Sequence, residues 1–398
     1  MTCHEWKFCK SLQLSLVRCC RWELLLRVVA IEPSGRLYGS EYCLLDIMRG
    51  LSTADRQFSV ICPHNLGFAS LLQEQGFTVR TVLPDLLHTQ RTFRKAGVYL
   101  RLLATVKSLR PDLIYINQAG MLRIGGLICR LLGVPAVCQV QTLEDAERIQ
   151  HSGLFAAPVM AYICNSDFIA SRTRIPADRC CMLYQGVAQS AAFVERIPDS
   201  HGVLRLGLIG RICESKGHYV ALQAARILHS RGVQFRIHVI GDGLTAHDCD
   251  RFTAAIQQAE LIEYFDLRGY CRDMRSQFSD MDVLLIPSLA EPLGRVLYDA
   301  ALHGVPVIAS DAGGLGEICR LYDVGVRIPA AAPELLADSI QAVSRQLPEI
   351  TRAFRIRSGL MLSALDMPGY LASVNTILTR AASGQPVAVR WTGSRLSH

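Results

Sequence analysis

An acidic side chain follows a strand-like run in the second half of the chain, and another acid follows it at a fixed spacing. The run Val283 to Pro287 is predicted to be a strand, and a helix is expected to begin near Leu293. Glu291 would then lie in the loop at the carboxyl end of the strand, where α/β sheets bind their ligands. Asp299 comes eight residues after Glu291, on the helix, where its carboxylate can accept hydrogen bonds from sugar hydroxyls.

The predicted beginning of this helix is suited to binding an anion. The first turn of a helix has unpaired N–H groups and a partial positive charge, so a diphosphate fits there. Gly294 has no side chain and would allow a ligand to approach closely. The candidate donor-binding residues at this place are Leu293, Gly294, Arg295 and Val296.

Two further loops supply groups with related chemistry. Arg211 and Lys216 follow the predicted strand Leu204 to Gly210, so their two positive charges could neutralise a diphosphate leaving group. Gly269 ends another predicted strand, where exposed backbone groups could read a base. Each loop alone could be an ordinary solvated connection, whereas the three loops together favour a nucleotide diphosphate.

An α/β fold would place these loops at one edge of a sheet. Apolar strand-like runs alternate with helical patterns along the chain and are joined by short turns that contain Gly and Pro, which predicts parallel sheets. The runs expected to be strands include 24–31, 58–62, 78–83, 113–117, 136–140, 161–165, 204–210, 235–240, 262–267, 283–287 and 307–310. The sequence therefore predicts two Rossmann-like domains whose parallel sheets face each other across a cleft.

The predicted domains divide the chain into four parts. Residues 1–23 form an N-terminal extension, residues 24–197 the first Rossmann-like domain, and residues 198–365 the second. The tail from Leu347 to Arg380 is expected to be helical, and its part from residue 366 on could return to the first domain before the chain ends at residue 398.

Composition narrows the class of protein. Half of the 398 residues are hydrophobic and 19% are charged, so the chain is globular, and its net charge of +7 suits an anionic ligand or membrane. No zinc-finger, RNP or bZIP pattern accompanies this modest charge, so nucleic acid is not an expected partner. The fifteen cysteines are scattered without a CxxC pair, which is typical of free thiols in a reducing cytosol.

The order of these motifs resembles that of glycosyltransferase family 4, whose members have the GT-B fold. The resemblance is specific from Leu204 to Glu317 and weaker in the first half, where Tyr38-Gly39-Ser40-Glu41 is similar to the glycine loop of the family. The motifs that carry it are Gly210-Arg211, Lys216-Gly217, Ile240-Gly241-Asp242-Gly243, Leu267-Arg268-Gly269, Glu291-Pro292-Leu293-Gly294-Arg295-Val296, Asp299-Ala300 and Gly313-Gly314-Leu315-Gly316-Glu317.

The resemblance implies that residues 24–197 form the acceptor-side domain and residues 198–365 the nucleotide-sugar-binding domain, and it implies a role for several residues. Arg211 and Lys216 would bind the donor diphosphate, Glu291 would lie near the donor sugar, and these three are the candidate catalytic residues. Asp299 would hold the ribose, and Gly39 would face the donor phosphate or the acceptor across the cleft. The family is retaining, so the leaving phosphate is expected to help deprotonate the acceptor while the protein stabilises charge.

Two departures from the family pattern bear on this reading. The second acid is Asp299 where the family has Glu, so its carboxylate is one methylene shorter. The segment Gln139 to Leu143 falls where many relatives carry a His near the transferred sugar, and this chain has none there. Gln141 or Glu144 could take its place.

Metal and cofactor signals are weak. The Asp-x-Asp tripeptides 248–250 and 280–282 are of a kind that arises by chance, so neither a metal nor a cofactor is expected. The resemblance implies a UDP- or GDP-linked sugar as the donor substrate. His303 is expected to cap a helix, because Gly304 follows it. His218 is expected at the surface or in a cap, with donor contact as the alternative.

The remaining expectations concern partners and location. The stretch Arg91 to Leu109 is basic and amphipathic, which indicates either a solvated helix face or peripheral contact with an anionic membrane. The expected acceptor is a glycan or lipid-linked glycan of cell-envelope polysaccharide or lipopolysaccharide synthesis, handled in the cytoplasm or at the inner face of the membrane. Two alternatives are a degenerate subunit that binds nucleotide or glycan, and a nucleotide-sugar epimerase.

Overall fold

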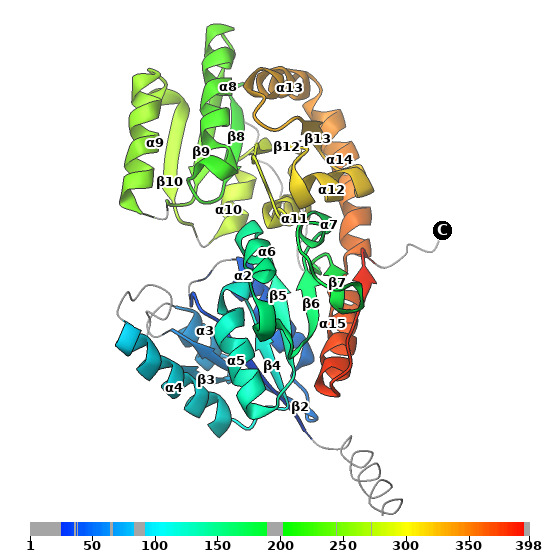
Figure 1. The fold of residues 1–398 in the computed structure, drawn as a ribbon. Coiled ribbons are helices and arrows are strands. Elements are labelled where there is room, and N and C mark those ends of the chain that lie inside the picture. The colour runs from blue at the N-terminus through cyan, green and yellow to red at the C-terminus, as the bar shows by residue number, and fades with distance from the viewer. Residues whose placement is uncertain are drawn as a thin grey trace, which may run out of the picture.

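The structure, a computed structural model, describes residues 25–35, 37, 39–63, 67–82, 92–188, 202–243, 245–271 and 273–393, and only the backbone of residues 92–96. The expected N-terminal extension, residues 1–23, lies outside the described residues, as do Tyr38, Arg91 and the expected domain boundary between residues 197 and 198. The described chain folds into two α/β units, one above the other in Figure 1.

The first domain is built on an eight-stranded sheet in which all pairs of strands are parallel. Its strand order is β14-β7-β6-β5-β4-β1-β2-β3. Central strands such as β4 and β5 are buried along their whole length because helices cover both faces. The strands are β1 (Leu26–Ile31), β2 (Arg56–Cys62), β3 (Thr78–Thr81), β4 (Leu113–Ile116), β5 (Ala136–Val140), β6 (Val159–Cys164), β7 (Cys180–Leu183) and β14 (Arg390–Trp391).

Two sets of helices cover the faces of this sheet. One core cluster contains side chains of α2 (Gly39–Leu51), α3 (Phe68–Glu74) and α15 (Met367–Ala382), and these helices lie on the same face. A second cluster contains side chains of the helices on the opposite face. These are α4 (Thr92–Ser108), α5 (Leu122–Leu132), α6 (Leu143–Gln150) and α7 (Asp167–Ala170), with the short 3-10 turns η2 (Ala119–Met121), η3 (Gly153–Ala156) and η4 (Ala177–Arg179) nearby.

The second domain repeats this plan with a six-stranded parallel sheet, in the order β10-β9-β8-β11-β12-β13. Helices α8, α9 and α13 share one core cluster with it, and α10, α11, α12 and α14 share another. The strands are β8 (Leu204–Ile209), β9 (Phe235–Ile240), β10 (Phe265–Gly269), β11 (Val283–Ile286), β12 (Val307–Ser310) and β13 (Val326–Ile328). The helices are α8 (His218–Ser230), α9 (Ala246–Gln258), α10 (Met274–Ser279), α11 (Arg295–His303), α12 (Gly313–Tyr322), α13 (Pro333–Arg345) and α14 (Leu347–Ala364), with the turns η5 (Glu214–Lys216) and η6 (Ile262–Tyr264).

The C-terminal part of the chain returns to the first domain. After α14 the chain turns at Leu365 and Asp366, and α15 buries its apolar side against the first sheet. The Tyr370 hydroxyl lies 3.4 Å from the Cys43 thiol of α2, and β14 adds a strand beside β7. Figure 1 shows α14 and α15 running down one side of both domains. The first domain is therefore completed by residues from the end of the chain.

Several predicted elements begin or end at other residues. The predicted strand from Ile262 was wrong at its start, since η6 occupies Ile262–Tyr264 and β10 begins at Phe265. The single helical tail is two helices, and the second is capped by the Asp366 carboxylate, which accepts from Gly369 N. The short strands β7, β13 and β14 were not predicted. The eleven cysteines within the described ranges are free thiols.

We expect truncation of Leu378 in α15 to destabilise the first domain. Its side chain is fully buried in the core cluster of that domain, so Leu378→Ala should cost about 2–5 kcal/mol of unfolding free energy. Urea unfolding of the full chain measures this cost. The exposed Thr376→Ala on the same helix is the matched control, and equal stability of the two variants would show that α15 does not support the fold.

Candidate active site between the two sheets

The loops that follow β8 and β11 meet because these strands are neighbours in the second sheet. Lys216 Nζ donates to Glu291 Oε2 at 2.6 Å, and the Ser288 hydroxyl donates to the same oxygen at 3.2 Å. A backbone hydrogen bond of 2.8 Å from Leu289 N to Ser215 O joins the two loops. The structure thus brings Lys216 and Glu291 into direct contact from positions 75 residues apart.

Gly217 makes this approach possible. Its φ of 76° is left-handed, and a Cβ atom at this position would lie 1.9 Å from the carbonyl oxygen of Pro287. Any other residue would therefore push the loop that carries Lys216 away from the end of β11. The pairing of Lys and Gly in the sequence motif has a direct steric reason.

The ion pair is buried on one side and open on the other. Glu291 is 7% exposed, whereas about a third of the Lys216 side chain is accessible. A partly exposed ammonium group beside an almost buried carboxylate can donate to an incoming oxyanion without leaving its partner, because it has three N–H donors. Arg211 lies half-buried in the same loop after β8.

The N-terminus of α11 lies directly after Glu291. Gly294 is the N-cap residue with a left-handed φ of 86°, and Arg295 and Val296 form the first turn. The Leu293 side chain is buried in the core of the second domain, so this residue can offer only its backbone to a ligand. Gly269 ends β10, two strands away from β8, and its carbonyl accepts from Gly241 N at 2.8 Å.

Asp299 lies one turn further along α11 and is partly exposed. Burial raises the pKa of its carboxyl above the ordinary value, and the neighbouring charges of Arg295 and His303 act in the opposite direction. The His303 ring nitrogen Nδ1 lies 2.7 Å from the Asp299 carbonyl oxygen, and Gly304 ends the helix in a left-handed conformation. His303 therefore supports the end of α11, as the sequence suggested.

The first domain presents the ends of its own strands to this site. Gly39 is the first residue of α2, and its carbonyl accepts from Arg295 Nη1 at 3.2 Å. A second contact joins the domains elsewhere, where the Glu317 carboxylate accepts from Asp167 N at 3.1 Å. Because Gly39 follows β1 and Arg295 follows β11, the carboxyl edges of the two sheets face each other.

Sequence analysis missed a cluster of buried polar groups at the edge of the first sheet. Glu32 and Glu41 are 1% and 0% exposed. Glu32 accepts from Ser34 N at 2.7 Å, from the Asn117 amide, and from Gln118 Nε2 at 3.3 Å, all of them neutral donors. Burial, with the nearby Glu41, raises the pKa of Glu32 to about 8, so this carboxyl is mostly protonated at neutral pH.

Gln141 lies at the end of β5, within the segment that lacks the family's His. Its backbone is fixed on both sides, since its N–H donates to Asp145 at 3.1 Å and its carbonyl accepts from Asn165 at 3.1 Å. Its side-chain nitrogen is buried and has no hydrogen-bond partner among the described residues. Glu144 is exposed on α6. Of the two substitutes suggested by the sequence, Gln141 has the unused donor.

The expectation that His218 lies at the surface was wrong. The residue is 1% exposed, and its ring packs edge-on against Phe252 at a centroid distance of 5.4 Å. Burial lowers its pKa to about 4, so the ring is neutral. The apolar spacing of α8 places residue 218 on the buried side of the helix, a periodicity that could have revealed this.

The two Asp-x-Asp tripeptides have structural partners. Asp248 caps α9 by accepting from Thr245 N at 2.9 Å. Asp282 and Asp280 both bind Arg205, with ion-pair distances of 3.1 and 3.4 Å. Within the described ranges, no three His, Cys, Asp or Glu side chains gather in a way that could hold a metal ion.

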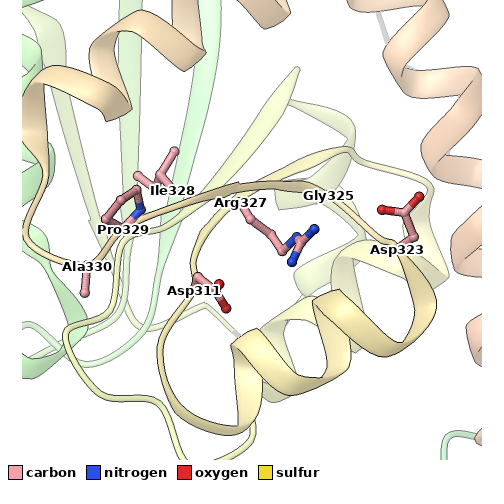
Figure 2. A pocket seen from close by; sticks show the side chains of 7 residues that line it. All are labelled: Asp311, Asp323, Gly325, Arg327, Ile328, Pro329 and Ala330. Atoms are coloured by element: carbon pink, nitrogen blue, oxygen red, sulfur yellow. The ribbon is translucent and has the colours of Figure 1, made fainter.

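An open cavity of about 620 Å³ lies beside the edge strand β13. Figure 2 shows Arg327 extending between Asp311 and Asp323 in this cavity. The two carboxylates already pair with Arg320 and Arg357. None of the predicted donor residues lines the cavity, so we assign it no part in the site.

Comparison with known proteins matches both domains. A family model described as "Glycosyltransferase Family 4" matches residues 38–190, and one described as "Glycosyl transferases group 1" matches residues 204–346. Together these matches contain the glycine loop of the first domain and the loops with Lys216 and Glu291 in the second.

Curated relatives are similar over parts of their length. The 2-deoxystreptamine glucosyltransferase of Streptomyces kanamyceticus is 29% identical over 60% of this chain and 68% of the relative. The putative colanic acid biosynthesis glycosyltransferase WcaL of Salmonella typhimurium is 27% identical over 45% of this chain and 46% of the relative. The GDP-mannose-dependent alpha-mannosyltransferase of Mycobacterium tuberculosis is 27% identical over 58% of this chain and 63% of the relative. The chain thus spans about half to two thirds of these relatives.

Solved structures agree in fold over almost the whole chain. The crystal structure of Anabaena Alr3699/HepE in complex with UDP-glucose has a TM-score of 0.77 at 18% identity, and the match covers 89% of this chain and 99% of that one. WaaG, a glycosyltransferase involved in lipopolysaccharide biosynthesis, has a TM-score of 0.67 at 15% identity. The match covers 88% of this chain and 99% of WaaG. At these identities the likeness establishes a shared fold.

The buried Glu32 predicts a pH dependence of stability. Its pKa is raised from an ordinary 4.5 to about 8, so between these values the folded state holds a proton that the unfolded state has lost. The contribution of Glu32 to the free energy of unfolding is therefore fully present below pH 4.5. It falls as the pH rises towards 8, by at most about 1.4 kcal/mol per pH unit.

Urea unfolding at pH 5.5 and pH 8 tests this in the wild type and in Glu32→Gln. The glutamine keeps the shape of the side chain but does not titrate. We expect the loss of stability between the two pH values to be clearly smaller in Glu32→Gln than in the wild type. The exposed Glu74→Gln should behave like the wild type. An unchanged pH dependence in Glu32→Gln would contradict the assignment.

Proposed function

Because the chain belongs to glycosyltransferase family 4 and has the GT-B fold, we propose that it transfers a sugar from a nucleotide-sugar donor with retention of configuration. The observation that carries this proposal is the Lys216–Glu291 contact of 2.6 Å beside the N-terminus of α11. It places a cation, a carboxylate and free helix N–H groups within one small region. That combination suits a diphosphate linked to a polyhydroxyl group.

In this proposal the second domain stabilises the leaving group. Lys216, Arg211 and the first turn of α11 bind the diphosphate, whose negative charge grows as the bond to the sugar breaks. The acceptor oxygen then bonds to the anomeric carbon on the face that the leaving phosphate vacates, and a phosphate oxygen takes the proton of the acceptor hydroxyl, which gives retention. Glu291 orients Lys216 and lies beside the donor sugar, while Asp299 holds the ribose. No metal or cofactor takes part.

The first domain supplies a polar partner for the sugar. We propose that the Gln141 amide takes the place of the family's His, because its buried nitrogen has no hydrogen-bond partner among the described residues. An unpaired buried donor is costly, and a sugar hydroxyl would satisfy it. Gly39 faces the same region from the beginning of α2.

The relatives support a proposal for the classes of donor and acceptor. HepE has been crystallised with UDP-glucose, and another relative is named as GDP-mannose-dependent, so a UDP- or GDP-linked sugar is the proposed donor. WcaL is named for colanic acid biosynthesis and WaaG for lipopolysaccharide biosynthesis. We propose a glycan or lipid-linked glycan of the cell envelope as the acceptor, handled on the cytoplasmic side.

A thermal-shift screen against UDP-, GDP-, ADP- and dTDP-sugars tests the donor site. A ligand at about 100 times its dissociation constant stabilises the fold by about 2.7 kcal/mol, which raises the melting temperature by several degrees. We expect one nucleotide class to give this shift, with or without EDTA. Lys216→Ala should abolish most of it and lower turnover about 10²–10³-fold.

Lys107→Ala, a change at an exposed cation far from this edge, is the matched control and should keep the shift. Full turnover by Lys216→Ala would contradict the assigned role of this residue. The absence of a shift with every nucleotide sugar would favour a degenerate subunit, and release of a free epimerised nucleotide sugar would favour an epimerase.

The outer helices of the first domain support peripheral contact with an anionic membrane. Helices α4 and α5 lie side by side on one face of the sheet (Figure 1) and contain six Lys and Arg residues and no acid. Leu100 on α4 is 68% exposed, Leu131 on α5 62%, and Leu154 of η3 75%. Arg130 donates to the Leu154 carbonyl at 3.2 Å, which joins η3 to this surface.

This surface includes the described part of the basic, amphipathic stretch 91–109, and α5 widens it. Exposed leucines among arginines can enter the headgroup region while the cations bind anionic lipids. Within the described residues, no helix is long and apolar enough to span a bilayer. We therefore propose peripheral contact through α4, α5 and η3.

Co-sedimentation with vesicles tests this surface. The wild type should bind vesicles containing phosphatidylglycerol more strongly than vesicles of phosphatidylcholine, and Leu127→Gln combined with Leu131→Gln should weaken that binding several-fold. Leu360→Gln, at a leucine 51% exposed on α14 of the second domain, is the matched control. Equal binding of both vesicle types would count against the proposal.

A further inference from the structure

Helix α12 of the second domain begins against the loop that carries Glu291. A Cβ atom on Gly313 would lie 2.3 Å from the Glu291 carbonyl oxygen. A Cβ atom on Gly314 would lie 2.0 Å from the carbonyl oxygen of Pro292. The Glu291 carbonyl also accepts from Leu315 N at 3.4 Å. The position of the Glu291 loop is therefore fixed by the first turn of α12.

The same helix contacts the first domain one turn further on. Glu317 Oε2 accepts from Asp167 N at 3.1 Å and from the Tyr184 hydroxyl at 3.3 Å. The Cβ atom that Gly314 lacks would also lie 2.8 Å from Ser166 Cβ. Figure 1 shows α12 beside α7, the helix that begins at Asp167. One short helix thus contacts the proposed donor loop and the other domain at the same time.

The segment of the first domain that Glu317 contacts is also bonded to Gln141. Asn165, two residues before Asp167, donates from its side-chain amide to the Gln141 carbonyl oxygen at 3.1 Å. Its backbone N–H donates to the Val140 carbonyl at 3.4 Å, which joins the ends of β5 and β6. Asn165 is 8% exposed, so water has little access to these hydrogen bonds. The position of Gln141 is therefore tied to the segment that binds Glu317.

A carboxylate is well suited to fix this segment. The Asp167 N–H has no partner within α7, because it belongs to the first turn of that helix. A hydrogen bond to an ionised acceptor is shorter and stronger than one between neutral groups. Glu317 is half-buried, so the contact is partly shielded from solvent.

We infer that Glu317 is a positioning residue that fixes Gln141 of the first domain relative to Glu291 of the second. The inference rests on the proposed function, in which Glu291 and Gln141 contact the donor sugar from the two domains. Because α12 contacts the Glu291 loop at one turn and the Asp167 segment at the next, this helix sets the separation of the two residues. Glu317 acts through Gln141 and does not touch the donor.

Glu317→Ala should lower turnover without weakening the binding of a nucleoside diphosphate. The groups proposed to bind the diphosphate all belong to the second domain, so calorimetry with UDP and GDP should give dissociation constants close to those of the wild type. Release of UDP from UDP-glucose, or of GDP from GDP-mannose, should show a kcat about 10–100-fold lower at a similar KM, because a displacement of about 1 Å beside the reacting atoms costs this much.

Two further variants show whether the accepting oxygen is the cause. Glu317→Gln keeps an oxygen that can accept from both Asp167 N and the Tyr184 hydroxyl, so most of the lost kcat should return. Glu263→Ala, at an exposed glutamate of the same domain, is the matched control and should behave as the wild type does. Adding Glu317→Ala to Gln141→Ala should lower kcat little further, because the two residues act as one unit. Losses that multiply would contradict a role through Gln141.

Hydrogen exchange of the full chain without a ligand measures the same effect for any donor sugar. In Glu317→Ala, exchange should be faster than in the wild type in residues 165–170 and also in residues 139–145, which contain Gln141. Exchange in residues 211–217 of the donor loop should stay the same. Faster exchange in residues 165–170 alone would show that Glu317 supports only α7, and this result would overturn the inference.

The outcomes separate this inference from the proposed function. Full turnover by Glu317→Ala, or a loss of UDP and GDP affinity in this variant, would overturn the inference and leave the donor site of the wild type intact. If UDP, GDP, ADP and dTDP all failed to bind the wild type, the proposed function would be wrong and the inference would fall with it.

Discussion

Two loops from neighbouring strands of the second sheet are held together by the ion pair between Lys216 and Glu291, and the proposed donor site depends on this contact. An almost buried carboxylate needs a partner, because an isolated buried charge is strongly unfavourable. The pair in turn requires Gly217, whose conformation brings the loop against the end of β11. The same Glu291 lies directly before α11, so the position of the helix N-terminus is linked to the position of the cation.

The two facing sheet edges differ in charge. The edge of the second domain presents Lys216, Arg211 and Arg295, which suit a diphosphate. Near the edge of the first domain lie the buried carboxyl of Glu32, which is mostly protonated at neutral pH, its partner Asn117, and the Gln141 amide. A neutral edge opposite a cationic edge suits the proposal that one domain holds the donor diphosphate and the other contacts uncharged hydroxyl groups.

The sequence was sufficient for the two-sheet architecture and for placing Lys216 and Glu291 at one sheet edge, because both follow from local patterns. Apolar runs alternating with helices predict parallel sheets, and residues that follow neighbouring strands must share an edge, which is why Lys216 and Glu291 were expected together. The Glu32 cluster could not be predicted, since its partner Asn117 lies 85 residues away and no periodicity marks the contact. Strands β7, β13 and β14 contain two to four residues and depend on pairing rather than on local preference.

The contacts between the domains differ in how easily they can be remade. Near α7, Gly314 packs so closely that a Cβ atom would lie 2.0 Å from the Pro292 carbonyl oxygen and 2.8 Å from Ser166 Cβ, and Glu317 accepts hydrogen bonds from the α7 backbone. A close-packed contact of this kind resists sliding. The contact between Arg295 and Gly39 is a single hydrogen bond among partly exposed charges, worth about 1–3 kcal/mol. A ligand that interacts with the arginine by a similar amount could therefore replace this contact, whereas remaking the close-packed contact near α7 would cost more.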